Sequence, residues 1–220
     1  MSKKAVIFDL DGTLTNTLRS IQKTTNLVLE TFGLEPYEID RYRYFVGDGA
    51  AELVKRAFSG RGCVDESVIE RAVAQYHVEF EKYCMYEVKP YEGIQELLTV
   101  CKERGILLAV NSNKPHARTI DVVEEIFGKG TFDCLVGQSP DRKRKPSPDG
   151  IHLILDTFGL SKEDVIYLGD TSTDMLTGHN AEVYTVGALW GFRDEAELRE
   201  YNADAIISYP MDLLPLIESK

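Results

Sequence analysis

Residues 6–15 read VIFDLDGTLT, an apolar run followed by two aspartates one residue apart and then by Gly-Thr. The apolar residues predict a short buried strand, and the Asp-Gly pair is typical of the turn in which such a strand ends. Asp9 and Asp11 carry like charges, so each makes ionisation of the other more costly. We therefore expect other groups to compensate for the pair, although a simple strand-ending turn is the alternative that this stretch leaves open.

Similar apolar runs recur in the second half of the chain, and segments with helical periodicity separate them. Several runs are apolar on both faces, which is typical of parallel strands covered by helices. The alternation predicts an open α/β fold with a parallel sheet flanked by helices. The expected strands cover residues 3–8, 106–112, 132–137, 164–170, 183–189 and 205–208, and the expected helices between them cover residues 94–104, 115–127 and 149–159.

The region after the first motif interrupts this alternation, because it holds helical patterns and no convincing strand. We expect an α/β core made of residues 1–15 and 89–220, into which residues 16–88 are inserted as a small helical domain. Pro90 begins the segment in which the chain returns to the core.

The composition limits the classes of partner. A formal net charge of −11 and a sequence pI of about 4.9 argue against sequence-independent binding to nucleic acid or to an anionic membrane. A small anionic substrate needs only a local cluster of cations. The apolar runs are too short to span a membrane, and the N-terminus is not typical of a signal peptide, so we expect a cytoplasmic protein with free thiols.

Chemically useful residues follow several of the expected strands. In an open α/β sheet, ligands bind beyond the carboxyl ends of the strands. Clustered carboxylates suit a hard cation such as Mg²⁺, which would allow Asp9 and Asp11 to coexist, and a lysine with a hydroxyl suits a phosphate. The residues at these ends are Asp9, Asp11, Ser112, Asn113, Lys145, Asp170 and Asp174.

Each motif alone has a structural alternative. Asp170 could cap a helix and Asp174 could be an exposed helix acid, while Ser112-Asn113 could cap the helix after Pro115. The basic run at residues 142–145 is typical of a solvated loop, and we expect this of three of its four charges. A calcium loop is disfavoured, because no glutamate stands at its twelfth position.

Taken together, the motifs resemble those of the haloacid dehalogenase superfamily of phosphohydrolases. FDLDGTLT (8–15), NSNKP (111–115), KPSPDG (145–150) and YLGDTSTD (167–174) occur in the family order. The resemblance covers essentially the whole chain and implies a Rossmannoid core with an inserted α-helical cap. The stretches VGDGAAELVKRAF (46–58), PYEGIQELL (90–98) and TVGALWGF (185–192) resemble the phosphoglycolate phosphatase-like branch.

The resemblance implies a role for each motif. Asp9 would be the nucleophile that forms an aspartyl-phosphate, and Asp11 would protonate the leaving oxygen and then activate water. Asp9, the backbone carbonyl of Asp11, and Asp170 would bind Mg²⁺, with Asp174 as a further ligand or a support. The residues implied to bind phosphate are Ser112, the amide of Asn113, Lys145, Gly12 and Thr13.

The implied function is that of a Mg²⁺-dependent phosphatase acting on a small phosphorylated metabolite, with phosphoglycolate as the first expectation. A sugar-phosphate mutase of the β-phosphoglucomutase type, a pyrophosphatase and a 5′-nucleotidase are alternatives within the superfamily. Dehalogenation is disfavoured because Asp11 is present. A phospho-aspartate receiver is the non-enzymatic alternative, and it is disfavoured because receivers lack a helical cap.

Substrate choice is expected to depend on the cap. Gly47, Asp48 and Gly49 are the candidate specificity loop, with a helix-initiating turn as the alternative, and the hinge is expected near Asn16 and Pro90. The chain departs from the family pattern at Asn16, where aspartate is common, and at Ala181-Glu182, where Ala-Gly is usual. Neither departure removes a catalytic residue.

Overall fold

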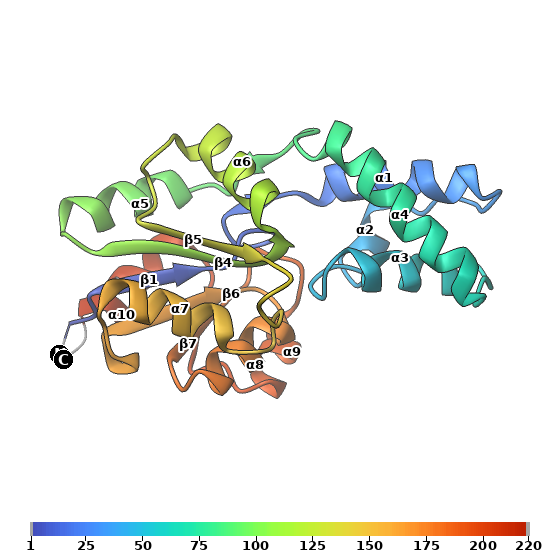
Figure 1. Cartoon of the computed structure of the whole chain (residues 1–220). Coiled ribbons are helices and arrows are strands. Elements are labelled where there is room, and N and C mark those ends of the chain that lie inside the picture. The colour runs from blue at the N-terminus through green and yellow to red at the C-terminus, as the bar shows by residue number, and fades with distance from the viewer. Residues whose placement is uncertain (1, 219–220) are drawn as a thin grey trace. The chain divides into compact units, whose positions relative to one another are not determined.

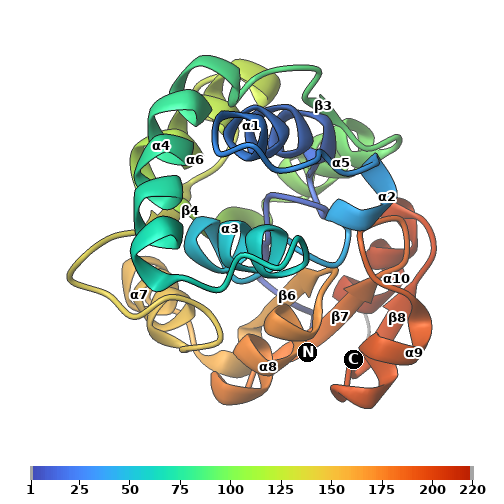
Figure 2. The ribbon, with the colours of Figure 1, turned by 90° about the vertical axis from the view of Figure 1, so that its right-hand side faces the viewer.

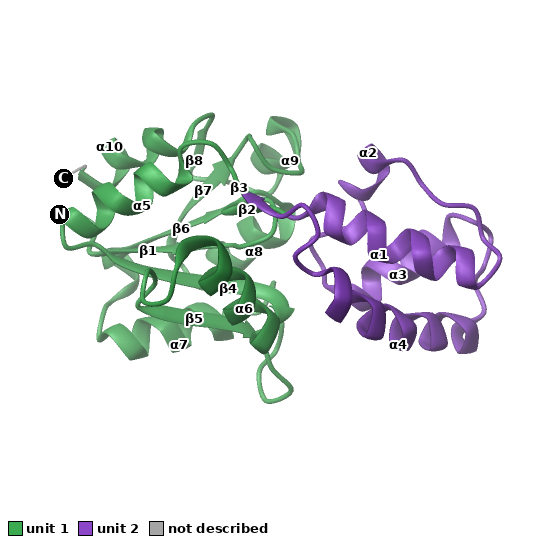
Figure 3. Ribbon diagram, turned by 90° about the horizontal axis from the view of Figure 1, so that it is seen from above, with its two compact units in different colours: residues 1–16, 90–220 green, residues 17–89 purple. Residues whose placement is uncertain are grey.

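The computed structural model describes residues 2–218. The chain forms two compact units, one made of residues 1–16 and 90–220 and the other of residues 17–89 (Figure 3). Each boundary lies one residue from the boundary expected from the sequence.

Within residues 2–218, the first unit is built on a six-stranded sheet with the order β5-β4-β1-β6-β7-β8. Neighbouring strands pair in parallel, and β1 lies between β4 and β6, with Ile7 opposite both Ala109 and Tyr167. This arrangement confirms the predicted α/β class. The strands are β1 (Ala5–Phe8), β4 (Leu107–Pro115), β5 (Cys134–Gln138), β6 (Val165–Gly169), β7 (Tyr184–Ala188) and β8 (Ala205–Ile207).

Helices cover both faces of this sheet, which explains why its central strand is apolar on both sides. Helices α5 and α6 lie on one side, and α7 and α8 lie on the other (Figures 1 and 2). Ile151 and Ile154 of α7 pack in one buried cluster with Ile7 of β1 and Val165 of β6. The helices are α5 (Ile94–Glu103), α6 (His116–Phe127), α7 (Asp149–Phe158), α8 (Ser172–Asn180), α9 (Glu195–Glu200) and α10 (Leu213–Glu218), with 3₁₀ turns at Lys162–Asp164 and Pro210–Asp212.

The second unit is helical and has its own apolar core. Its longest helices, α1 and α4, pack against each other, and Val28, Leu29, Val54 and Phe58 are fully buried. The helices are α1 (Leu18–Thr31), α2 (Ile39–Tyr42), α3 (Ala50–Ser59) and α4 (Glu66–Tyr83).

One feature near the boundary differs from the prediction. Thr15–Asn16 forms the short strand β2, which pairs with β3 (Lys89–Pro90). The expectation that residues 16–88 contain no strand is therefore wrong at Asn16, because a strand of two residues is too short to show a periodic pattern.

None of the helices in residues 2–218 has the length and apolar content needed to cross a bilayer.

The parallel sheet decides where the site lies. All its carboxyl ends point to one edge, so the segments that follow β1, β4, β5 and β6 meet there although they are far apart in the sequence.

Candidate active site

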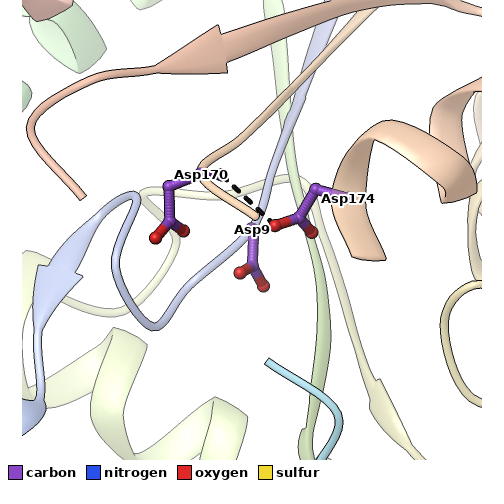
Figure 4. A group of neighbouring side chains, drawn as sticks. All are labelled: Asp9, Asp170 and Asp174. Atoms are coloured by element: carbon purple, nitrogen blue, oxygen red, sulfur yellow. Dashed lines mark hydrogen bonds between the residues drawn. The ribbon is translucent and has the colours of Figure 1, made fainter. Parts of the chain in front are cut away.

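Asp9, Asp170 and Asp174 converge at this edge of the sheet (Figure 4). Asp9 follows β1, Asp170 follows the neighbouring strand β6, and Asp174 lies in the first turn of α8. One carboxylate oxygen from each residue lies within 4.8 Å of those from the other two, and all three side chains are buried. Among the described residues, this acidic cluster is the arrangement that could hold a metal ion.

Lys145 supplies positive charge to the acidic cluster. It lies in the loop between β5 and α7, and its Nζ is 2.7 Å from Asp9 Oδ1 and 2.7 Å from Asp174 Oδ1. Asn113 holds the backbone of this lysine, because its Oδ1 accepts a bond from Lys145 N at 2.8 Å and its Nδ2 donates to Lys145 O at 3.2 Å. The Asn113 side chain thus fixes the loop, a role that was not expected from the sequence.

Asp174 is held by hydrogen bonds to both of its oxygens. Oδ1 accepts from the hydroxyl of Tyr167 at 2.7 Å as well as from Lys145. Oδ2 accepts from Thr171 Oγ1 at 2.7 Å and from the Asp170 amide at 3.2 Å, the bond drawn in Figure 4. Asp174 therefore has one fixed orientation.

The alternatives that made Asp170 or Ser112-Asn113 a helix cap and Asp174 an exposed helix acid are wrong. The residue that caps α8 is Thr171, whose side chain accepts from Asp174 N, so Asp170 is not the N-cap. Asp174 is fully buried, so it is not an exposed helix acid. Ser112-Asn113 does not cap the next helix either, because Pro115 occupies the N-cap position of α6 and makes no side-chain cap bond.

Asp170 is enclosed by the turn that follows β1. Its Oδ1 accepts from Thr13 Oγ1 at 2.8 Å, and its Oδ2 accepts from the Phe192 amide at 2.8 Å. Gly12 has φ +98°, and a Cβ on Gly12 would lie 2.7 Å from Asp170 Cγ. Gly12 and Thr13, which were expected to contact phosphate, thus both serve to position Asp170.

Burial raises the pKa of two acids in the cluster. Burial and then the Asp174 carboxylate raise the pKa of Asp9 well above its ordinary range, and Lys145 opposes this change. The same two causes raise the pKa of Asp170 to about 7. A positive charge in addition to Lys145 would favour the ionised forms of Asp9 and Asp170.

Asp174 and Lys145 form an ion pair inside the cluster. Although burial alone would raise the pKa of Asp174, Lys145 and the hydroxyls of Tyr167 and Thr171 lower it. Burial alone would likewise lower the pKa of Lys145, but the Asp174 and Asp9 carboxylates raise it above its ordinary value. Both residues are therefore ionised at neutral pH.

Asp11 points its carboxylate toward another cation. Lys114 Nζ lies 2.8 Å from Asp11 Oδ1 and 3.0 Å from Oδ2. The Lys114 side chain is only 3% exposed. Lys114 was not singled out as a site residue, although one signal was available: it stands two residues after Ser112, and residues two apart in a strand point to the same side.

Ser112 lies buried at the end of β4, and its Oγ accepts from Lys114 N at 3.2 Å. Ser112, Asn113 and Lys145 are among the residues that line a cavity of about 10 Å³, so the structure brings these three of the five expected phosphate-binding residues together.

In the basic run, Lys143 and Arg144 are exposed as expected, but Arg142 is half-buried and donates to Gly137 O at 2.6 Å.

The candidate specificity loop lies in the second unit, in the turn that precedes α3. Gly49 is the N-cap residue, with φ +87°, and Gly47 has φ +116°. Arg56 of α3 forms an ion pair with Asp48 and donates to Phe45 O at 3.0 Å. Gly47, Asp48 and Gly49 therefore form the turn that initiates α3.

Comparison with known proteins shows what this chain is similar to. A family model described as haloacid dehalogenase-like hydrolase matches residues 6–188. The phosphoglycolate phosphatase of Aquifex aeolicus is 29% identical over 216 residues, which are 98% of this chain and 97% of that protein. The N-acetylmuramic acid 6-phosphate phosphatase of Pseudomonas aeruginosa is 27% identical over 219 residues, which are 99% of this chain and 96% of that protein.

The fold is similar to that of solved structures over its full length. A crystal structure from Lactobacillus delbrueckii subsp. bulgaricus, described as a candidate phosphoglycolate phosphatase, superposes with a TM-score of 0.96. It is 27% identical in sequence, and all of both chains is covered.

Proposed function

The chain belongs to the haloacid dehalogenase-like hydrolase family, and from this premise we propose that it is a phosphomonoester hydrolase whose nucleophile is Asp9. The observation that carries the proposal is the 2.7 Å ion pair between Lys145 and Asp9 inside the buried acidic cluster. Burial alone would favour a neutral, poorly nucleophilic carboxyl group, and the lysine favours the ionised form that can attack phosphorus.

The acidic cluster fits a hard divalent cation. The three acids Asp9, Asp170 and Asp174 lie within reach of one ion, and the buried ammonium of Lys145 contacts Asp9 and Asp174 only. Burial and then the Asp174 carboxylate raise the pKa values of Asp9 and Asp170, so a bound cation would favour their ionised forms. Oxygen ligands of this kind are those that Mg²⁺ prefers. We propose that Asp9, Asp170 and the backbone carbonyl of Asp11 hold Mg²⁺, and that Asp174 supports them. When bound, the ion stabilises negative charge on the transferring phosphoryl group.

In the proposed first step, a carboxylate oxygen of Asp9 attacks phosphorus and the bond from phosphorus to the ester oxygen breaks. Asp11 gives its proton to that oxygen, which leaves as an alcohol. Ser112 Oγ, the backbone N–H of Asn113 and the ammonium of Lys145 hold the phosphoryl oxygens during the transfer.

In the second step, ionised Asp11 takes a proton from water, and the water oxygen attacks the phosphorus of the aspartyl-phosphate. The bond between phosphorus and Asp9 breaks, which releases phosphate and restores the carboxylate of Asp9. The protons balance over the two steps, because Asp11 regains the one that it gave to the alcohol.

Phosphoglycolate is the substrate that we propose first, because the similarity to a phosphoglycolate phosphatase extends over 98% of this chain. N-acetylmuramic acid 6-phosphate is the second candidate, on the strength of the relative that acts on it. We assign the choice between small phosphate esters to the loop of Gly47, Asp48 and Gly49. Its two glycines adopt positive φ and Arg56 holds its acid, so the loop has a defined shape.

A phosphate-release assay with Mg²⁺ tests the function. The substrates are phosphoglycolate, N-acetylmuramic acid 6-phosphate, pyrophosphate, a hexose 1-phosphate and a nucleoside 5′-monophosphate. We expect the highest kcat/KM with phosphoglycolate, and we expect Asp9→Asn to lower it by at least about 10³-fold, because the nucleophile is lost.

The matched control is Asp156→Asn, which changes an exposed acid of α7 in the same way and should keep wild-type activity. Activity that survives in Asp9→Asn would contradict the assignment of the nucleophile. Conversion of hexose 1-phosphate to hexose 6-phosphate without release of phosphate would show a mutase instead.

A further inference from the structure

We propose that Lys114 is the positioning residue for Asp11, and that it holds the carboxyl group where it can transfer a proton to the leaving oxygen. The inference rests on the phosphatase mechanism proposed above. Lys114 Nζ contacts both carboxylate oxygens of Asp11, at 2.8 and 3.0 Å, so the ammonium determines where the carboxylate points.

The backbone of Lys114 is fixed from several sides. Its N–H donates to Ser112 Oγ at 3.2 Å, and its carbonyl accepts from Thr119 Oγ1 at 3.2 Å. Gly137 of β5 packs so closely that a Cβ there would lie 2.8 Å from Lys114 O. The lysine side chain therefore extends from a backbone that cannot shift easily, and its surroundings bury it.

Asp11, in contrast, lies in a turn and its side chain is 21% exposed. Gly12 N donates to Thr15 O at 2.9 Å and Thr15 N donates to Leu10 O at 3.0 Å, which closes the turn around Asp11 without contacting its carboxylate. The side chain thus has rotational freedom that the ion pair with Lys114 removes.

The two aspartates of the first motif are each paired with a different lysine. Lys145 contacts Asp9 at 2.7 Å, and Lys114 contacts Asp11 at 2.8 Å. Lys114 lies near the end of β4 and Lys145 lies in the loop after β5, so the two carboxyl groups are paired with lysines from different segments. This separation lets one act on phosphorus while the other acts on the leaving oxygen.

A purely structural role for the pair is the alternative. Buried charges need partners, and an ion pair could simply fasten the turn after β1 to the end of β4. The two roles predict different kinetics. A residue that positions the proton donor matters most when the leaving group needs a proton, whereas a structural residue affects all substrates alike.

The test compares phosphoglycolate, which is an alkyl ester, with 4-nitrophenyl phosphate in the whole chain with Mg²⁺. An alkoxide is a poor leaving group that needs a proton, but 4-nitrophenolate leaves without one. The parameter is kcat/KM, which reports phosphoryl transfer to Asp9 and not the later hydrolysis. We expect Lys114→Met to lower kcat/KM for the alkyl ester by about 10²-fold or more, and by at least about tenfold more than for the aryl ester.

Two variants serve as controls. Lys114→Arg keeps the positive charge and can still donate to both carboxylate oxygens of Asp11. It should therefore restore part of the alkyl-ester activity. Lys162→Met removes an exposed lysine that pairs with Glu182 and should behave as the wild type with both esters. An equal fall in kcat/KM for both esters in Lys114→Met would overturn the inference, and so would an unchanged alkyl-ester value.

A double variant covers the case in which Lys114→Met fails to fold. Asp11→Asn removes the carboxylate that pairs with the buried Lys114 ammonium, and adding Lys114→Met replaces that ammonium with an apolar side chain, so the double variant should be at least as stable as Asp11→Asn. If Lys114 acts through Asp11, the two variants share one ratio of alkyl to aryl kcat/KM. A further fall of that ratio in the double variant would overturn the inference.

The wild type separates this inference from the proposed function. If it hydrolyses neither ester, both are overturned. If it hydrolyses both and Lys114→Met loses both equally, only the role of Lys114 is overturned.

Discussion

Gly12 shows how tightly single residues define the acidic cluster. It lies between Asp9 and Thr13 in the turn after β1, its φ is +98°, and a Cβ on it would lie 2.6 Å from Phe192 Cε2 and 2.7 Å from Asp170 Cγ. The space that a side chain would fill is thus the space that Asp170 occupies. A close approach of this kind and a positive φ both require glycine.

We predict that Gly12→Ala lowers kcat at least tenfold and lowers the free energy of unfolding by about 1–3 kcal/mol, because the methyl group displaces Asp170 and the backbone is strained. Steady-state kinetics and denaturant unfolding measure the two effects. The control is Gly105→Ala, where φ is +70° and no atom lies within 4 Å of the added Cβ. That variant should lose stability by about 1 kcal/mol and keep its kcat. Wild-type kcat in Gly12→Ala would contradict the role of close packing.

At the scale of elements, the first turn of α8 contains a residue that both caps the helix and belongs to the acidic cluster. Thr171 and Asp174 form a capping box, in which each side chain bonds the backbone N–H of the other. The same Asp174 carboxylate bonds Lys145 at 2.7 Å. The capping interaction that starts the helix therefore also positions an acid of the cluster.

We predict that Thr171→Ala lowers the free energy of unfolding by about 1–2 kcal/mol and lowers kcat as well, because Asp174 Oδ2 loses the 2.7 Å bond from the threonine hydroxyl. The matched control is Asp65→Ala, which removes the N-cap of α4 in the second unit. It should cost about 1 kcal/mol of stability without lowering kcat. An equal effect of both variants on kcat would show that the cap of α8 has no special connection with the site.

At the scale of the whole molecule, the acidic cluster couples folding to pH and to Mg²⁺. Without metal, burial raises the pKa of Asp170 from 3.8 to about 7 in the folded protein. The folded state then binds the proton more tightly than the unfolded state. This group therefore contributes stability below about pH 4, and the contribution declines as the pH rises to about 7.

We predict that Mg²⁺ raises the Tm more at pH 8 than at pH 5, because only the ionised cluster binds the cation and the metal-free protein loses the contribution of protonated Asp170 as the pH rises. For one group, the slope is at most about 1.4 kcal/mol per pH unit. Thermal unfolding after chelation, with and without added Mg²⁺, measures the difference. Asp170→Asn is the control and should show a smaller response to both pH and Mg²⁺. An equal rise of Tm at both pH values would contradict the prediction.

Local patterns in the sequence were sufficient for the family and the class of fold. Apolar runs bounded by turn residues predicted the strands of the core sheet, because a strand that is buried on both faces must be apolar along its length. The order of the motifs, from FDLDGTLT to YLGDTSTD, indicated the haloacid dehalogenase superfamily, which the family match over residues 6–188 confirms. The same motifs pointed to Asp9, Asp170 and Asp174, which the structure brings together at one edge of the sheet.

Only the tertiary structure determines which of these side chains contact one another. Lys114 contacts Asp11 across 103 positions, and Thr13 contacts Asp170 across 157. Such pairings follow from the order and register of parallel strands, because β4 and β6 flank β1 and their carboxyl ends deliver these residues to one edge. The puzzle of two acids side by side in VIFDLDGTLT is resolved there: local periodicity predicts that a strand exists, but only the assembled sheet pairs Asp9 with Lys145 and Asp11 with Lys114.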